Sequence, residues 1–98
     1  MSVLMTLRVS GDPKAVEAAD QDVLRMVADR GREFGVIRHR FYGNDTEVLV
    51  IDEWPDEASF QAFFDSTPEI KGIMDAAGVM TPPTIEFWRP LDTEDNVG

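Results

Sequence analysis

The stretch Glu47-Val-Leu-Val-Ile-Asp-Glu-Trp-Pro55 decides how the rest of this 98-residue sequence is interpreted. Aliphatic and β-branched residues dominate it and Pro55 ends it, so it predicts a β-strand. Residues two apart in a strand point to the same side, which places Asp52 and Trp54 on one face. An aromatic helix face follows in the sequence, made of Phe60, Phe63 and Phe64. A carboxylate beside a tryptophan at this corner between strand and helix indicates a pocket.

Upstream of this stretch, the sequence predicts a strand, a long helix and another strand. Residues 3–9 are mostly apolar and suit a first strand. Apolar residues then recur at helical spacing over residues 13–30, after an Asp-Pro pair that fits a helix start. Residues 36–42 are strand-like and precede Gly43-Asn-Asp-Thr46, whose glycine and Asx residues favour a tight turn. The turn joins them to residues 47–54 in a predicted hairpin.

Downstream, the sequence predicts a second helix and a last strand. The helix begins at an Asp56 cap, breaks near residues 66–68, where a proline stands, and ends at Gly78. Residues 84–89 suit the last strand. The order of strand, helix, strand, strand, helix, strand predicts an α+β, ferredoxin-like βαββαβ fold, a four-stranded antiparallel sheet with two helices on one face.

The third strand also predicts a second copy of the chain. Residues 48–51 are apolar on both faces of the strand, a pattern expected only where both faces of the sheet are buried. Two sheets packed face to face in a homodimer would meet that need. We expect residues 1–91 to form one domain and residues 92–98 to be an acidic tail that frays.

Composition excludes several classes of function. The chain has no cysteine and one histidine, which rules out a disulfide framework and a thiol nucleophile and makes a zinc site improbable. A net charge of −10 argues against nucleic-acid partners. No apolar run is long enough to span a membrane, and the first residues lack a secretory signal, so we expect a cytoplasmic protein. Nucleotide- and cofactor-binding motifs are missing as well, so no cofactor is predicted.

The predicted element order and the acidic-x-Trp motif Asp52-Glu53-Trp54, followed by an aromatic helix face, carry a family resemblance. Over residues 3–91 the chain resembles the antibiotic-biosynthesis-monooxygenase-like family of dimeric α+β barrels. That family includes cofactor-free oxygenases of polyketide quinones, haem-degrading enzymes and many small proteins without a known reaction. The resemblance implies a homodimer with a ligand in each subunit, between the sheet and the helices.

The sequence departs from the haem-degrading branch of that family. That branch uses an asparagine on the first strand, and a tryptophan and a histidine on the second helix. Here Met5 and Thr6 occupy the first strand, and the predicted second helix carries Phe63 and Phe64 but no histidine. Haem degradation is therefore disfavoured.

The only histidine, His39, is a candidate acid–base group together with Asp52. If the hairpin turn is centred on Asn44 and Asp45, His39 pairs with Val50 and becomes a diagonal neighbour of Asp52 on the same face. A slip of one residue in the pairing of the two strands would place the two side chains on opposite faces. An aspartate partner stabilises an imidazolium, which suits proton transfer. Surface or structural duty for His39, and a strand-end pairing for Asp52, are the alternatives.

The candidate ligand-binding residues are aromatic or flexible apolar side chains, each of which also suits a core. Trp54 is the expected wall for a flat substrate, with an indole N–H that needs a partner. Trp88 alternates with its neighbour Phe87 on the last strand, and the sequence does not decide which of the two faces the helices. The full predicted lining is Phe41, Trp54, Phe60, Phe63, Phe64, Met74 and Trp88.

These features lead to one main hypothesis and two rivals. The main hypothesis is a small homodimer that binds an aromatic or lipophilic molecule and oxidises it as a cofactor-independent monooxygenase. The substrate carbanion would pass an electron to oxygen while His39 accepts a proton. One rival is a non-catalytic, ligand-binding or stress-associated barrel. The other is a cyclase or isomerase that uses His39 and Asp52 without oxygen.

Overall fold

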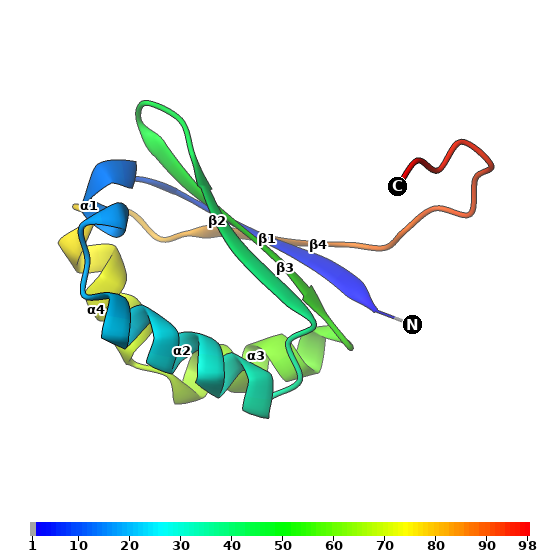
Figure 1. Cartoon of the computed structure of the whole chain (residues 1–98), viewed down its shortest axis with the longest axis horizontal. Coiled ribbons are helices and arrows are strands. Elements are labelled where there is room, and N and C mark those ends of the chain that lie inside the picture. Colours follow the sequence, from blue (N-terminus) through cyan, green and yellow to red (C-terminus); the bar gives the residue numbers. More distant parts are fainter. Residues whose placement is uncertain (1) are drawn as a thin grey trace.

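The computed structural model describes residues 2–98, which form one four-stranded antiparallel sheet and four helices (Figure 1). The strands, in the spatial order β2-β3-β1-β4, are β1 (Val3–Ser10), β2 (Arg38–Gly43), β3 (Glu47–Trp54) and β4 (Thr84–Trp88). The helices are α1 (Pro13–Glu17), α2 (Gln21–Glu33), α3 (Glu57–Ser66) and α4 (Glu69–Ala76). This order confirms the predicted α+β, ferredoxin-like fold.

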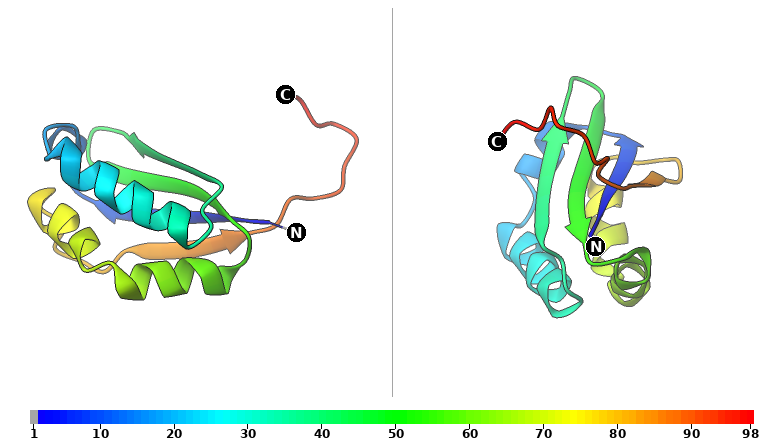
Figure 2. Two further views of the ribbon diagram at one scale, coloured as in Figure 1. Left: turned by 60° about the horizontal axis from the view of Figure 1, so that its bottom comes forward. Right: turned by 90° about the vertical axis from the view of Figure 1, so that its right-hand side faces the viewer.

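The sheet and the helices form two layers. All four helices lie on one side of the sheet, and the chain after β4 runs away from both layers (Figures 1 and 2). The largest fully buried side chains of the core are those of Met5 on β1, Trp54 on β3 and Phe60 on α3. The core therefore lies between the sheet and the helices, and no helix within residues 2–98 covers the other face of the sheet.

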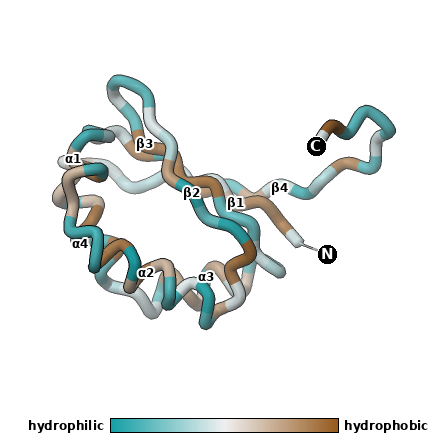
Figure 3. The backbone as a smooth tube through the Cα atoms, in the orientation of Figure 1, coloured by the Kyte–Doolittle hydropathy of each residue, from teal (hydrophilic) through white to brown (hydrophobic). Residues whose placement is uncertain are grey.

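Hydropathy follows this arrangement along the chain. Hydrophobic residues are concentrated in the two central strands, β1 and β3, whereas the tip of the β2–β3 hairpin is hydrophilic (Figure 3). β1 alternates between the two faces, with Met5, Leu7 and Val9 buried towards the helices. Such alternation is expected of a strand with its two faces in different surroundings.

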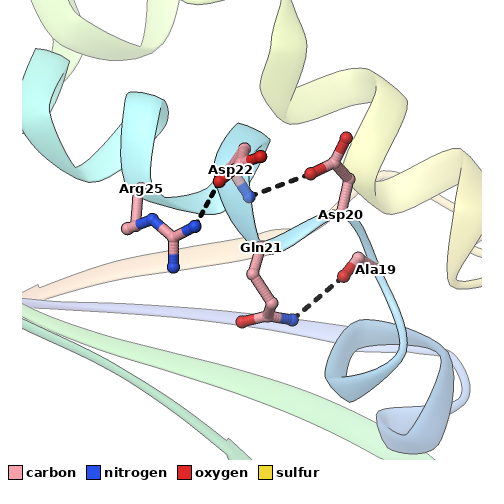
Figure 4. A network of polar contacts seen from close by, with 5 residues as sticks. All are labelled: Ala19, Asp20, Gln21, Asp22 and Arg25. Atoms are coloured by element: carbon pink, nitrogen blue, oxygen red, sulfur yellow. Dashed lines mark hydrogen bonds and ion pairs between the residues drawn. The ribbon is translucent and has the colours of Figure 1, made fainter.

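The prediction of one continuous helix over residues 13–30 is wrong, because the chain starts a new helix at Asp20. Asp20 has an extended backbone, and its carboxylate accepts a hydrogen bond from the Asp22 backbone N–H at 2.9 Å. The Gln21 side chain donates to the carbonyl of Ala19 at 3.0 Å (Figure 4). Aspartate is among the best N-cap residues, so capping by Asp20 starts α2 as a separate helix within a continuous apolar periodicity.

The break in the second helical region agrees with the prediction. Asp56 caps α3, and its carboxylate accepts from the Ser59 backbone N–H at 2.7 Å. The buried Thr67 hydroxyl donates to the Phe63 carbonyl at 2.7 Å, and Pro68 precedes α4. Gly78, just after α4, has a φ of 77°, a conformation that favours glycine. None of the helices within residues 2–98 is long and apolar enough to cross a membrane.

Candidate active site

The β2–β3 hairpin places His39 directly opposite Asp52. The predicted register was wrong by two residues, since it paired His39 with Val50. The difference arises in the turn, where the Asn44 side chain accepts hydrogen bonds from the backbone N–H groups of Thr46 and Glu47 and moves the turn centre by one residue. Moving the centre by one residue shifts the pairing by two, so both side chains stay on the same face.

The Asp52 carboxylate holds two side chains at once. Oδ1 lies 2.7 Å from His39 Nδ1, and Oδ2 accepts a hydrogen bond of 3.1 Å from the Trp54 indole Nε1–H. The Asp52 side chain is 5% exposed, whereas the His39 side chain is 34% exposed. One buried carboxylate thus connects a tryptophan of the core to a histidine at the edge of the sheet.

This connection assigns roles to the two nitrogens of the His39 ring. A carboxylate can only accept a hydrogen bond, so the nitrogen facing Asp52, Nδ1, carries a proton. In the neutral ring Nε2 is then the acceptor, and within residues 2–98 it has no hydrogen-bond partner. A histidine with this tautomer and a carboxylate behind it is equipped to remove a proton from a ligand. The same part of the chain contains no group of three or more His, Cys, Asp or Glu side chains placed to hold a metal ion.

Both residues line an apolar cavity between the sheet and the helices. Its volume is about 90 Å³. His39, Asp52 and Trp54 are the lining residues whose side chains carry nitrogen or oxygen; the other lining side chains are aliphatic, aromatic or thioether groups. The cavity therefore combines one proton-accepting group with walls suited to a hydrophobic ligand.

Most of the predicted lining residues do face this cavity. Trp54 is fully buried, and its ring centroid lies 5.8 Å from that of Phe60 and 5.2 Å from that of Phe63. These two rings occupy much of the surface against which a ligand was expected to stack. The predicted residues found in the lining are Phe41, Trp54, Phe60, Phe63, Phe64 and Met74.

Trp88 lies outside the cavity, in contrast to the sequence-based grouping. It pairs with Leu4 on β1, and its indole Nε1–H donates to the Thr6 hydroxyl at 2.9 Å. Both partners belong to the face of the sheet that has no helices, and Trp88 is 50% exposed. Phe87 takes the inward position instead, with its ring 5.6 Å from that of Phe60. Register with β1, which the sequence alone does not specify, decides between the two.

The aliphatic half of the lining is not predicted from the sequence. β1 and α2 supply much of it, and α4 adds two isoleucines. The sequence places these residues in a mostly apolar strand or at helical spacing, but it does not show how these elements are arranged around one cavity. The lining residues in question are Met5, Leu7, Val9, Leu24, Val27, Ala28, Ile70 and Ile73.

The fold is that of the antibiotic-biosynthesis-monooxygenase-like proteins. SnoaB of Streptomyces nogalater, a cofactor-independent oxygenase, superposes with a TM-score of 0.64 at 18% identity, over 97% of this chain and 98% of SnoaB. NE2512 of Nitrosomonas europaea, a protein of unknown function, gives 0.63 at 21% identity, over 99% and 96% of the two chains. A structure described as an antibiotic biosynthesis monooxygenase gives 0.65 at 14% identity, over 92% and 99%. No family model and no curated protein matches the sequence.

Proposed function

We propose that this chain works as a homodimer that binds an aromatic or lipophilic molecule in the cavity and oxidises it with molecular oxygen, without a bound cofactor. The hydrogen-bonded pair of His39 and Asp52 in an otherwise apolar cavity is the observation that supports this proposal. The shared fold of SnoaB, a cofactor-independent oxygenase, is consistent with it.

The chemistry begins with a proton transfer to His39. Nε2 takes a proton from an activated CH₂ group of the substrate, which leaves a carbanion. The carbanion gives one electron to O₂, and the resulting radical and superoxide combine at the same carbon to form a peroxide. The peroxide takes up a proton and then loses water, so that CH₂ becomes C=O. One oxygen atom of O₂ ends in the product and the other in water.

Charge compensation in this scheme comes from the same pair of residues. Once protonated, the His39 imidazolium lies beside the substrate anion and is itself stabilised by Asp52. The apolar walls offer water few hydrogen bonds, and apolar surroundings strengthen this interaction. Trp54 acts by positioning Asp52, since its indole N–H fixes the second carboxylate oxygen.

Oxygen uptake with a panel of aromatic carbon acids tests the proposal. We expect consumption of one O₂ per product, and a loss of roughly 100-fold or more in His39→Ala, the range for removal of a general base. Arg25→Gln serves as the control, because this exposed α2 side chain pairs with Asp22 (Figure 4) and neither residue lines the cavity. Unchanged turnover in His39→Ala would remove the proposal.

Proton transfer without oxygen is the second candidate function, and the same His39–Asp52 pair favours it. A cyclase or isomerase would use Nε2 to move a proton and would return the proton to its product. The oxygen electrode separates the two functions, since such an enzyme converts its substrate anaerobically. Binding without conversion under either atmosphere would favour a non-catalytic, ligand-binding barrel.

The homodimer is supported by the face of the sheet that lacks helices. This open face carries the exposed or half-buried side chains of Leu4, Tyr42, Leu49, Ile51 and Trp88. Apolar groups on one side of a small sheet gain from burial against a second copy. The open face lies opposite the cavity, so dimerisation would leave the His39 site of each subunit in place.

A further inference from the structure

The open face of the sheet carries charged side chains among its apolar ones. Most of these arginines and glutamates form ion pairs within the chain, namely Arg8 with Glu47 and Arg38 with Glu53. Arg40 on β2 and Glu86 on β4 are both exposed, and neither takes part in an ion pair within residues 2–98. One positive and one negative side chain on this face are thus left without an opposite charge.

Arg40 and Glu86 lie in one row across the sheet, at its two edges. Arg40 is opposite Ile51 on β3, and Ile51 is opposite Thr6 on β1. Thr6 is in turn opposite Glu86. At about 4.8 Å between neighbouring strands, the order β2-β3-β1-β4 separates the two charged residues by roughly 14 Å. Arg40 and Glu86 therefore do not meet within one subunit.

Twofold symmetry limits how a second copy can cover the open face. Two sheets in aligned face-to-face packing keep their strand directions within about 30° of each other, so the twofold axis runs either along the strands or across them. An axis across the strands places β2 over the partner's β2, where the arginines of the two edge strands repel each other. An axis along the strands places β2 over the partner's β4 and keeps each row at its own level. Arg40 then faces the partner's Glu86.

We infer that the homodimer has its twofold axis along the strands, and that Arg40 of each subunit forms an ion pair with the partner's Glu86. Sheets packed face to face are about 10 Å apart, a distance that an arginine and a glutamate side chain span together. Symmetry forms this pair twice in each dimer. The inference rests on the homodimer of the proposed function, but it concerns how the two copies are oriented.

Exchange of the two charges tests the inference, with the Kd of the dimer measured by sedimentation equilibrium of the full chain. Arg40→Glu opposes two carboxylates at both pairs and should raise the Kd at least about tenfold. Glu86→Arg opposes two guanidinium groups and should have a similar effect. The double variant Arg40→Glu/Glu86→Arg restores opposite charges and should return the Kd to within about threefold of wild type.

The control for charge reversal is Arg25→Glu, which changes the net charge of the chain as Arg40→Glu does. Arg25 is exposed on α2, on the helical side of the sheet, so its replacement should leave the Kd unaltered. Cross-linking gives a second measurement, because the chain has no cysteine and Arg40→Cys and Glu86→Cys each introduce one thiol. An equal mixture of these two variants, treated with a short bismaleimide, should give a covalent dimer that neither variant gives alone.

Each outcome decides the inference. A higher Kd in both single reversals, with recovery in the double variant, supports it. Single reversals that match Arg25→Glu overturn it, and so does a double variant as weak as the single ones. Covalent dimers from Arg40→Cys alone, or none from the mixture, also overturn it. In all these cases a wild-type dimer leaves the proposed homodimer standing, whereas a wild-type monomer at all concentrations defeats both.

Discussion

Among single side chains, Asp52 has the most demanding position, because one buried carboxylate accepts from two donors of different kinds. The Trp54 indole N–H is part of the core, and the His39 ring is partly exposed at the edge strand. Substitutions at Asp52 therefore act on stability through Trp54 and on proton transfer through His39. Two replacements separate these effects.

Asp52→Ala should destabilise the fold by about 1–3 kcal/mol, since it leaves the indole N–H buried without a partner. Asp52→Asn should lower the free energy of unfolding by less than Asp52→Ala does. Its amide oxygen can still accept a hydrogen bond from Trp54, while its NH₂ group donates one to His39. Urea unfolding followed by tryptophan fluorescence gives both free energies. Equal losses in the two variants would show that the indole hydrogen bond contributes little.

Asp52→Asn should also exchange the tautomer of His39. An amide NH₂ facing Nδ1 requires that nitrogen to be the acceptor, which moves the ring proton to Nε2. Nitrogen NMR of the only histidine, recorded at a pH where the ring is neutral, would show protonated Nδ1 in the wild type and protonated Nε2 in the variant. Proton transfer should fail in this variant although it folds, because Nε2 can no longer accept a proton. A ring with protonated Nε2 in the wild type would contradict the assigned roles.

Among the elements, α3 carries a cap whose strength depends on pH. The Ser59 side chain, and then its backbone N–H, lower the pKa of Asp56 below 3.8. Because the pKa is lower in the folded state, the stabilisation is present above pH 3.8 and is lost as the pH falls through the folded-state pKa. Asp56→Asn keeps a capping side chain that does not titrate.

Acid titration of the two proteins checks this difference. Wild type should lose more stability than Asp56→Asn between neutral pH and a pH below the folded pKa of Asp56, as measured by thermal unfolding. Asp22→Asn, which leaves the α3 cap intact, is the control for removal of one acidic group. If the melting temperatures of wild type and Asp56→Asn changed with pH in the same way, protonation of Asp56 would not weaken the α3 cap.

Element identity could be predicted from the sequence to a large extent, and element boundaries and pairing less well. Residues 47–54 are recognisable as a strand because a run of aliphatic and β-branched residues and a terminal proline agree. The division of the first helical region at Asp20 is not predictable from the sequence. A polar N-cap residue inside an apolar periodicity cannot be distinguished from a polar residue on the exposed face of a helix. The pairing of His39 with Asp52 depended on the turn, where one Asn44 side chain decides the register. The direction of Trp88 depended on a partner strand 82 residues away.

At the scale of the whole molecule, the open face of the sheet should determine whether the protein is a monomer or a dimer in solution. Ile51→Arg places a charge in the centre of the proposed interface and should convert a dimer to a monomer, because burial of an unpaired charge is costly. Sedimentation velocity over a range of concentrations measures the change. Met80→Arg adds the same charge at a side chain that is 92% exposed, in the segment after α4, and should leave the mass unaltered. A wild-type monomer at all concentrations would contradict the homodimer.

The bridge from Trp54 through Asp52 to His39 has a consequence for how this protein can change under selection. Asp52 contributes both to folding and to the proposed reaction, so few substitutions should be tolerated there. Most replacements that change its hydrogen bond to His39 also remove its hydrogen bond to Trp54 in the core. New specificities in a laboratory-evolved lineage should therefore accumulate at aliphatic residues that line the cavity, such as Val9 and Val48, while position 52 stays unchanged. The architecture keeps its chemistry constant and leaves its choice of ligand open to variation.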